Sequence, residues 1–383
     1  MNSVFIHRPV AEALSRKLFK GKAIILYGPR QAGKTTLLRG FLEGRREPVL
    51  WLNADEPDIR DQLRRPTSTL LRQIAGPHRI VCLDEAQRIP DIGLTLKLFV
   101  DSLPEVQVIA TGSSSFELAN RTAEPLTGRK YEFRLHPLGF HEMVAHHGLR
   151  TEKRLIDHRL VFGGYPEIVL KPGEQEELLP LLADSYLFKD ILLMDGLKKP
   201  TLLEKLLKAL ALQIGSEVSL NELGSLVGAD RGTVEKYLRL LEQAFIVFQL
   251  PAFARNVRNE LKKSRKVYFW DNGIRNAVLG QFQPIGLRPD AGALWENFLV
   301  SERHKLNHFR HRKPFCGFWR TTQQQEIDYL EEQGMTLSAW EFKWSSRAKT
   351  AFPLTFRRAY PNAKTRLVTP ENVEEFLLEG LSQ

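Results

Sequence analysis

Short apolar runs alternate with amphipathic stretches through the first 135 residues of the chain. Helical patterns such as Lys34–Glu43 and Ile92–Ser102 lie between most of these runs. Strands that are apolar along their length and separated by helices are typical of a parallel sheet with helices on its faces. The first half therefore predicts an α/β domain whose strands are Ala23–Tyr27, Val49–Asn53, Ile80–Asp84, Val106–Thr111 and Tyr131–Leu135.

The pattern changes after residue 145. A helical region, 151–194, is interrupted by the sequence GGYP, and shorter helices follow from Pro200. Ser219–Leu226 and Arg231–Gln243 predict two helices joined by a turn, and Phe245–Leu250 predicts a strand. Helix, turn, helix and strand is the element order of a winged helix. The last part predicts a helix from about Trp295 and then strands near Phe318, Ile327–Glu331 and Leu337–Lys343.

These patterns divide the chain into four predicted segments. They are a P-loop core (1–145), a helical lid or linker (146–199), a winged-helix-like module (200–254) and a C-terminal α/β domain (255–383). With 383 residues, 43% hydrophobic and 26% charged, the composition is that of a globular protein and excludes wholesale disorder. Two cysteines exclude a disulfide framework and a zinc site built from cysteines. We find neither a signal-peptide pattern nor an apolar run that could cross a membrane, and we expect a cytoplasmic protein.

The net charge of +10 is concentrated in two segments. Residues 255–266 contain six basic residues and one acid, and residues 303–320 contain six basic residues and no acid. Clustered positive charge attracts nucleic acid because binding releases counterions from the phosphates. A solvated face that keeps the protein soluble is the alternative. Both interpretations stay open on charge alone.

The first predicted strand leads directly into a phosphate-binding loop. GPRQAGKT matches GxxxxGK[ST] and is followed by a predicted helix, which is the context this motif requires. Backbone N–H groups and the helix N-terminus can hold a triphosphate, Lys34 should reach its β and γ phosphates, and the hydroxyl of Thr35 should bind Mg²⁺. The predicted nucleotide-binding residues here are Gly28, Pro29, Arg30, Gln31, Ala32, Gly33, Lys34, Thr35 and Thr36.

Later strands end in residues suited to hydrolysis. IVCLDE places Asp84 where it can hold Mg²⁺ and Glu85 where it can polarise the attacking water. The next strand ends in ATGSSS, where Ser113 or Ser114, or else Thr111, can sense the γ phosphate. An arginine in LTGR, Arg129, could stabilise the charge of the transition state, from the same subunit or a neighbour, and Arg121 competes for that role. Surface salt bridges are the alternative for both arginines.

The motifs GPRQAGKTTLL, LDEAQ, ATGSSS, LTGR, HPLGF and GGYPE resemble those of AAA-family P-loop ATPases with a DUF4143-type C-terminal region. The resemblance extends through SRKVYFWDNGIRNAVLG, ALWENFLVSERHK, EIDYL and AWEFKW, so it covers nearly the whole chain. It implies an AAA+-like sheet with strand order 5-1-4-3-2. It also implies nucleotide and Mg²⁺ chemistry at Lys34, Thr35, Asp84 and Glu85. No sensor-2 arginine can be placed, and a homo-oligomer stays an open alternative.

The predicted winged helix carries basic residues on the exposed side of its second helix. Arg231, Lys236 and Arg239 could contact double-stranded DNA there, together with the basic segments 255–266 and 303–320. Winged helices also serve as protein-binding modules, which is the alternative. His304, His308 and His311 follow a helical spacing, and we expect them to extend the basic face rather than to bind zinc.

Carboxylates and a lysine recur in the C-terminal region at a spacing similar to that of PD-(D/E)xK nucleases. Glu341 and Lys343 share one face of a predicted strand, because side chains repeat every two residues. With Asp328 on the preceding strand and Glu296 on a helix, they could bind a second Mg²⁺ and activate water. The alternative is an amphipathic strand in a domain that has lost catalysis.

The leading hypothesis is a Mg²⁺-dependent ATPase that couples its nucleotide state to a DNA-binding C-terminal region. One alternative is a nuclease gated by ATP. A second is a nucleotide-controlled protein-interaction switch without DNA, and a third is a nucleotide-driven transcriptional regulator.

Overall fold

The computed structural model describes residues 6–113, 126–192, 199–253, 265–321, 323–345, 347 and 351–380, with the backbone alone for 185–192. The chain forms two compact units, Met1–Pro137 with Gln243–Phe245, and Leu138–Glu242 with Ile246–Gln383. The predicted linker, winged-helix-like module and C-terminal domain thus belong to the second unit. Their predicted boundaries stay predictions.

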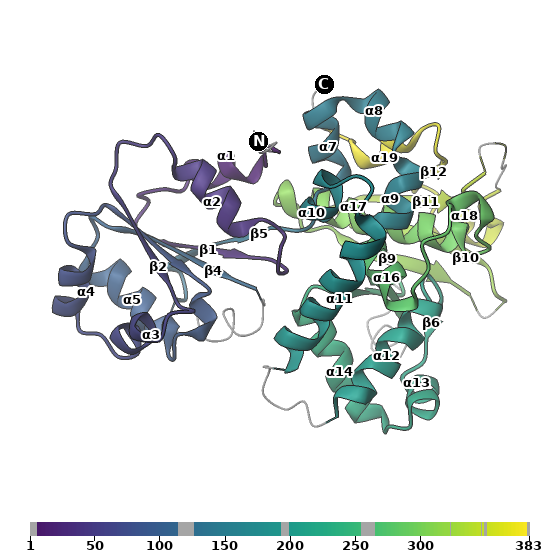
Figure 1. The fold of residues 1–383 in the computed structure, drawn as a ribbon. Helices are drawn as coiled ribbons and strands as arrows, with labels where there is room; N and C mark the ends of the chain where they lie inside the picture. Colours follow the sequence, from purple (N-terminus) through teal and green to yellow (C-terminus); the bar gives the residue numbers. More distant parts are fainter. Residues whose placement is uncertain are drawn as a thin grey trace. The chain divides into compact units, whose positions relative to one another are not determined.

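The first unit is built on a five-stranded parallel sheet (Figure 1). Its order is β2-β3-β4-β1-β5, which confirms the order expected from the resemblance. The strands are β1 (Ala23–Tyr27), β2 (Val49–Asn53), β3 (Ile80–Asp84), β4 (Gln107–Gly112) and β5 (Lys130–Arg134). Each lies within one residue of its prediction, because these strands are short, strongly apolar and bounded by turn residues.

Helices complete the first unit on both sides of the sheet. They are α1 (Val10–Ser15), α2 (Lys34–Leu42), α3 (Pro57–Leu63), α4 (Ser68–Ala75), the short η1 (Ala86–Arg88) and α5 (Ile92–Ser102). One core cluster joins β1, β3 and β4 to α1 and α2 through Leu14, Ile24, Leu38, Cys82 and Ile109, all at most 1% exposed. The alternation of strand and helix follows the sequence pattern and sets the carboxyl ends of the strands at one edge of the sheet.

The second unit begins with helices and a small antiparallel sheet. Its helices are α7 (Phe140–His147), α8 (Leu149–Arg154), α9 (Ile156–Phe162), α10 (Pro166–Leu170), α11 (Gln175–Leu192), α12 (Pro200–Leu212), α13 (Leu220–Val227) and α14 (Arg231–Gln243). The three strands pair in the order β6-β8-β7, with β6 (Glu217–Val218), β7 (Val247–Pro251) and β8 (Arg265–Phe269). Strand β8 does not follow from the sequence pattern, since its first two residues belong to the basic segment 255–266.

A four-stranded sheet completes the second unit. Its order is β12-β11-β10-β9, with β9 (Phe315–Arg320), β10 (Glu326–Gln333), β11 (Thr336–Phe342) and β12 (Lys364–Val368). The other elements are α16 (Asn272–Leu279), η2 (Ile285–Leu287), α17 (Ala291–Phe309), α18 (Leu354–Ala359) and α19 (Val373–Leu377). The two sheets of this unit meet where Ala252 bridges to Phe318 and the Phe253 N–H donates to the Phe318 carbonyl at 2.6 Å.

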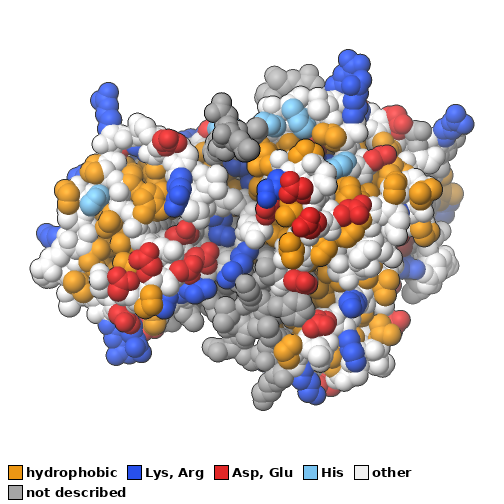
Figure 2. Space-filling view, viewed as in Figure 1, with side chains coloured by type: hydrophobic (Ala, Val, Ile, Leu, Met, Phe, Trp, Pro, Cys, Tyr) orange, Lys and Arg blue, Asp and Glu red, His pale blue; other side chains and the backbone are white. Residues whose placement is uncertain are grey.

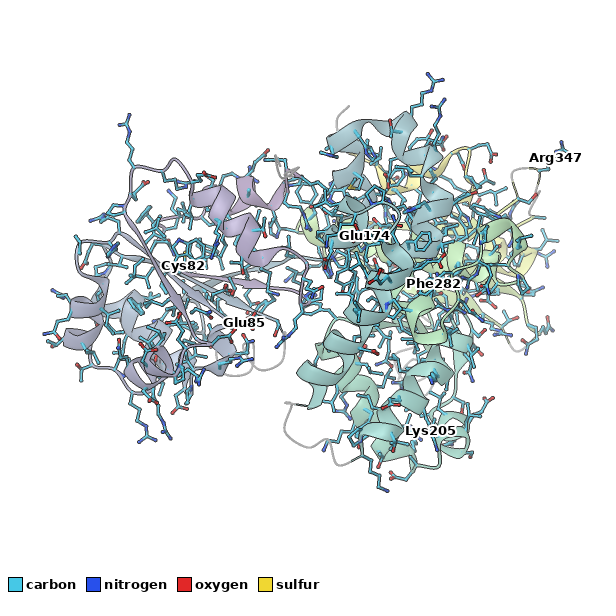
Figure 3. The ribbon with its side chains drawn as sticks, in the orientation of Figure 1. Cys82, Glu85, Glu174, Lys205, Phe282 and Arg347 are labelled. Carbon is cyan, nitrogen blue, oxygen red and sulfur yellow. The ribbon has the colours of Figure 1, made fainter. Side chains whose placement is uncertain are left out.

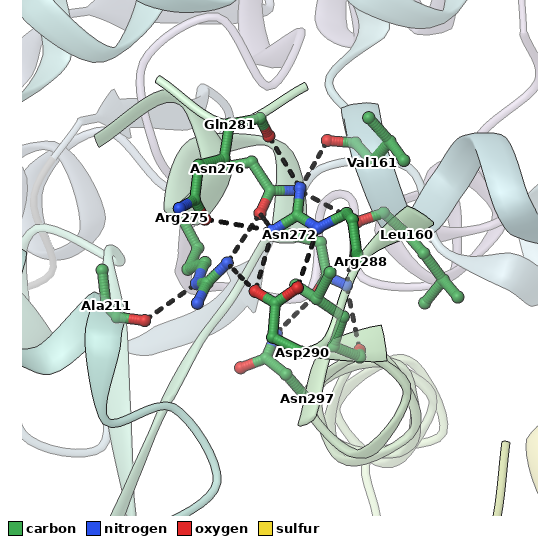
Figure 4. A network of polar contacts seen from close by, with 11 residues as sticks. Leu160, Val161, Ala211, Asn272, Arg275, Asn276, Gln281, Arg288, Asp290 and Asn297 are labelled. Atoms are coloured by element: carbon green, nitrogen blue, oxygen red, sulfur yellow. Dashed lines mark hydrogen bonds and ion pairs between the residues drawn. The ribbon is translucent and has the colours of Figure 1, made fainter. Parts of the chain in front are cut away.

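A buried polar network fixes α16 against its neighbours (Figure 4). Asp290 accepts hydrogen bonds from Arg275 and Arg288 at 2.7 and 2.8 Å. Burial alone would raise the pKa of Asp290, but the two guanidinium groups hold it at about 2. Asn272 and Asn297 join the network through their side-chain amides, at 2.6 Å from one another. Because nearly all of these groups are buried and paired, the network fixes the arrangement of α9, α12, α16 and α17.

Candidate functional site

The loop between β1 and α2 is a tight turn with two residues in the left-handed region. Gly33 has a φ of 90° and Gln31 a φ of 57°, both in the left-handed region. A Cβ on Gly28 would lie 2.0 Å from the carbonyl oxygen of Leu135 on the neighbouring strand end. Only glycine fits that approach, so the first glycine of the motif is required by the fold itself.

Two buried cations bind the carbonyl groups of this loop. Lys34 is 6% exposed, and its ammonium donates to the carbonyls of Gly28 and Pro29 at 2.8 Å each. Arg8 donates to the carbonyl of Ala32 at 3.1 Å and to that of His136 at 2.7 Å. No sequence pattern indicates a role for Arg8, because it precedes every recognisable motif. The loop is thus anchored from two sides.

The start of α2 and the ends of β3 and β4 bring Thr35, Asp84 and Thr111 together. The Thr35 hydroxyl donates to Oδ2 of Asp84 at 2.8 Å, and the Thr111 hydroxyl donates to the other carboxylate oxygen. The backbone N–H of Glu85 donates to the Thr111 hydroxyl at 3.2 Å. The threonine and aspartate that the sequence predicts as Mg²⁺ ligands therefore lie in direct contact.

Glu85 follows the end of β3 (Figure 3) and has a left-handed φ of 52°. Gln87 donates through Nε2 to the carboxylate of Glu85 and, at 3.1 Å, to the hydroxyl of Ser113. Gln87 thus links the predicted water-polarising residue to the predicted phosphate sensor. The sequence pattern does not indicate this role for Gln87, although the residue belongs to the LDEAQ motif. Ser114 and Arg121 lie outside the described residues.

The other predicted loop residues flank this cluster. Pro29 and Ala32 are buried, Arg30 is partly buried, and Gln31 and Thr36 are exposed. The loop therefore has buried residues that pack into the first unit and exposed polar residues at the carboxyl edge of the sheet.

Arg129 lies at the other end of the sheet. Its carbonyl accepts a hydrogen bond from Ala23 at the start of β1, whereas the phosphate loop follows the end of that strand. At about 3.3 Å per residue, the strand separates them by roughly 15 Å. The guanidinium of Arg129 pairs with Asp101 at 2.7 Å. Within this first unit, Arg129 does not join the cluster around Thr35 and Asp84.

The predicted C-terminal carboxylates converge, with two lysines between them. Lys266 lies 2.9 Å from Oε1 of Glu296, and its ammonium also pairs with Glu326. Lys343 lies 3.0 Å from Glu341 and 4.0 Å from Asp328. The backbone N–H of Phe342 donates to Asp328 at 2.7 Å. The sequence predicted Glu296, Asp328, Glu341 and Lys343 as members of this cluster. The structure adds Lys266 and Glu326 to it.

Burial dominates the acid–base behaviour of this cluster. Burial and the neighbouring Glu341 raise the pKa of Asp328 to about 6. The pKa values of Glu296 and Glu341 are also raised, chiefly by burial. Burial opposes the charge of Lys266, but Glu296 and Glu326 outweigh it and raise the pKa of that ammonium. Lys266 therefore stays charged and compensates the carboxylates.

Among the described residues, no group of three or more His, Cys, Asp or Glu side chains is arranged to hold a metal ion. In the predicted second metal site, the ammonium groups of Lys266 and Lys343 lie against the carboxylates instead. The assignment of Glu296, Asp328 and Glu341 as metal ligands stays a prediction.

The two basic segments do not form one exposed face. Lys266 is 2% exposed and pairs with carboxylates, and residues 254–264 lie outside the described residues. In the second segment, Arg303 pairs with Glu331, and Lys305 pairs with Glu302 at 2.7 Å. Helix α17 buries Arg303 and Lys305 in the core, so these two cations are available neither to a solvated face nor to nucleic acid. On the face shown in Figure 2, described Lys and Arg side chains stand in separate groups among acidic and apolar ones.

His304 corrects another expectation from the sequence. Its ring lies 4.8 Å from that of Phe248, and its Nε2 is buried without a hydrogen-bond partner among the described residues. Burial lowers the pKa of His304 to about 4. It therefore does not extend a basic face. The helical spacing could not distinguish the inner from the outer side of α17.

The predicted DNA-contacting residues of α14 are exposed. Arg231, Lys236 and Arg239 face solvent, and Val234, Tyr237 and Leu238 are buried on the opposite side. Arg239 pairs with Glu235 at 3.4 Å. The amphipathic pattern therefore predicted both the helix and its orientation.

The strand order, the loop and the carboxylate at the end of β3 define an α/β fold like that of the AAA+ P-loop ATPases. A family model of an AAA domain matches residues 20–144, and a model of a domain of unknown function, DUF4143, matches residues 291–379. A further domain of unknown function, DUF8612, matches residues 153–284. These matches support an AAA-family ATPase fold with a DUF4143 C-terminal domain, which this chain resembles.

Curated relatives match this chain along most of their length. An uncharacterized protein of Mycobacterium tuberculosis is 29% identical over 337 residues, covering 85% of this chain and 71% of the relative. An uncharacterized protein of Methanocaldococcus jannaschii is 22% identical, covering 82% of this chain and 73% of the relative.

Among solved structures, the Aeropyrum pernix ORC1 protein in complex with DNA has a TM-score of 0.35 and 14% identity, covering 72% of this chain and 93% of that chain. The Thermotoga maritima RuvB Holliday junction branch migration motor has a TM-score of 0.33 and 17% identity, covering 69% and 92%. Among the described residues, no helix is long and apolar enough to cross a membrane.

Proposed function

We propose that this protein hydrolyses ATP in a Mg²⁺-dependent reaction and couples its nucleotide state to DNA binding by the second unit. The observation that carries the proposal is the direct contact of Thr35 with Asp84 beside the buried Lys34. The residue types and their positions at the carboxyl edge of a parallel sheet fit a P-loop nucleotide site.

The residues fit both the nucleotide and the metal ion. Thr35 and Asp84 would hold Mg²⁺, whose chemistry in such sites is neutralisation of the phosphate charge. Lys34 would leave the carbonyls of Gly28 and Pro29 for the phosphates, since an ammonium binds an oxyanion more strongly than a neutral carbonyl. The backbone N–H groups of residues 30–35 would bind the remaining phosphate oxygens.

Glu85 is the proposed general base. Its carboxylate would accept a proton from the attacking water, and Gln87 would hold that carboxylate in place while Ser113 contacts the γ phosphate. Because Arg129 lies at the far end of its own sheet, we propose that it would act only on the site of a neighbouring copy.

The proposed DNA contact rests on the order of elements around α14. Helix α12, strand β6, helices α13 and α14, and strands β7 and β8 follow one another as in a winged helix. Arg231, Lys236 and Arg239 on the exposed side of α14 would contact phosphates.

The ATPase rate, measured with and without double-stranded DNA, tests this function. We expect hydrolysis by the wild type, a loss of about 100-fold or more in Glu85→Gln, and loss of ATP binding in Lys34→Ala. Lys20→Ala is the matched control, because Lys20 is an exposed lysine of the same unit outside the loop. Undiminished ATP affinity in Lys34→Ala would refute the nucleotide site.

DNA dependence separates the coupled ATPase from the interaction switch. A salt-sensitive mobility shift that weakens in Arg231→Gln/Lys236→Gln would support DNA coupling. An ATPase that neither binds DNA nor responds to it would favour a switch that acts on proteins.

A second candidate function is DNA cleavage at the C-terminal carboxylates. The convergence of Asp328, Glu341 and Lys343, with a raised pKa for both carboxylates, favours it. Cleavage that requires Mg²⁺ or Mn²⁺ and is lost in Asp328→Ala and Lys343→Ala would support this candidate. Equal cleavage by wild type and both variants would refute it.

A further inference from the structure

A concave pocket of about 340 Å³ lies in the second unit, between the end of α17, the β10–β11 hairpin, β12 and the segment after α19. Five cations line it: Arg303, Arg310, Arg312, Lys364 and Arg366. Two acids, Glu331 and Glu379, also line it. The charged lining therefore carries an excess of three positive charges.

The acids compensate only part of this charge. Arg303 is bound by Glu331 and Glu379, the latter at 2.7 Å, and Arg366 lies 3.6 Å from Glu379. Arg312 donates instead to the neutral side chain of Gln333, at 2.7 Å. Among the described residues, Arg312 and Lys364 make no ion pair.

The guanidinium of Arg310 lines the pocket close to the positive charges of Arg303 and Arg312. It donates to the backbone carbonyls of Glu379 and Gly380, which carry no net charge. Burial, followed by the charges of Arg312 and Arg303, lowers the pKa of Arg310. An anion that entered the pocket would relieve this repulsion.

Neutral donors stand beside the cations. The hydroxyls of Thr336 and Ser338 line the pocket on strand β11, next to Lys364 on the paired strand β12. Guanidinium groups and hydroxyls together suit the tetrahedral oxygens of a phosphate. The volume lies at the lower end of the range for small-molecule sites.

We propose that this pocket binds a phosphate group, carried either by a free nucleotide or by the end of a nucleic-acid strand. An extended duplex backbone fits less well, because the concave wall also presents Glu331 and Glu379. The pocket is separate from the phosphate loop, which belongs to the first unit. It is lined by Thr336, Ser338 and Trp340 of β11, whereas Glu341 of the carboxylate cluster alternates to the other face of that strand.

Phosphate binding by the full chain tests the proposal, with Lys34→Ala as the background so that the loop contributes least. Titration calorimetry would use inorganic pyrophosphate, and separately an oligonucleotide with and without a 5′-phosphate. The pocket variant is Arg312→Gln/Lys364→Gln. The control is Arg357→Gln/Arg358→Gln, which removes two exposed arginines of α18 outside the pocket.

We expect the pocket variant to bind at least one probe about ten-fold or more weakly than the control, since two charged hydrogen-bond donors are lost. A loss for pyrophosphate identifies a free ligand, and a loss only for the 5′-phosphorylated strand identifies a strand end. Equal affinities in the pocket variant and the control, or no binding of any probe to the control, would overturn the proposal. Neither result depends on whether the first unit hydrolyses ATP.

Discussion

The ammonium of Lys266 on β8 lies 2.9 Å from Oε1 of Glu296 on α17. Tyr268, two residues along the same strand, donates its hydroxyl to the same oxygen at 2.6 Å. The small antiparallel sheet therefore supplies the counter-charge for a carboxylate of helix α17. A buried charge is stable only when it is paired, so these two parts of the second unit depend on one another.

Lys266→Met should destabilise the second unit by about 3 kcal/mol, because the largely buried Glu296 and the partly exposed Glu326 lose their shared partner. The same substitution removes the ammonium from between the carboxylates, so that a metal cation could bind in its place. We expect millimolar Mn²⁺ or Mg²⁺ to raise the melting temperature of Lys266→Met more than that of the wild type. Differential scanning calorimetry with and without the metal measures both effects.

Lys266→Met/Glu326→Gln is the control for this prediction. It removes one carboxylate together with the lysine, so the destabilisation and the response to metal should both shrink. A Lys266→Met protein as stable as the wild type would contradict the role of Lys266 as counter-charge.

Gln87 should act as a positioning residue for hydrolysis. Gln87→Ala removes the link between Glu85 and Ser113, so we expect kcat for ATP to fall about ten-fold with KM changed less than about two-fold. Arg88→Ala is the matched control, because Arg88 makes a surface ion pair with Asp55 and should leave both constants unchanged. A rise in KM with kcat unchanged would place Gln87 in nucleotide binding instead.

The first unit could be predicted in detail because its signals are local. Strands such as Ile80–Asp84 are apolar up to their last residue, and the phosphate-loop motif requires a strand before it and a helix after it. Arg8 could not be predicted, since its partners, the carbonyls of Ala32 and His136, are set by the fold. The same holds for the distance of Arg129 from the loop, which depends on strand direction.

The second unit was harder to predict because its polar residues are buried. Lys266 and Arg303 look like parts of basic surface segments, yet each is bound by carboxylates from distant elements. Strand β8 was missed for this reason. Glu341 and Lys343 could be predicted because strand alternation is local, whereas Lys266, which pairs with Glu296 and Glu326, needed the tertiary structure.

Gly163 should tolerate no side chain. It has a φ of 73°, and a Cβ would lie 2.0 Å from Oδ1 of Asp271, whose other oxygen accepts the Gly164 N–H at 2.8 Å. Gly163→Ala should therefore lower the free energy of unfolding by more than about 2 kcal/mol, through backbone strain and displacement of Asp271. Urea denaturation followed by circular dichroism measures the change.

Gly173→Ala separates the two causes. Gly173 also has a positive φ, 94°, but nothing lies within 4 Å of its Cβ position. We expect it to cost about 1 kcal/mol, from backbone strain alone. Equal losses in the two variants would mean that the contact with Asp271 contributes nothing.

His304 should make the stability of the second unit sensitive to acid. Burial lowers its pKa from the ordinary value of 6.5 to about 4, so between these values the unfolded chain binds a proton that the folded chain does not. Stability should fall as the pH drops from 6.5 towards 4, by a total of about 3 kcal/mol at most. His304→Phe keeps an aromatic ring beside Phe248 and removes the titrating group, so its urea midpoint should change less between pH 7 and pH 5 than that of the wild type. His146→Phe, at an exposed histidine of the same unit, should keep the wild-type pH dependence, and an unchanged pH dependence in His304→Phe would show that other groups govern it.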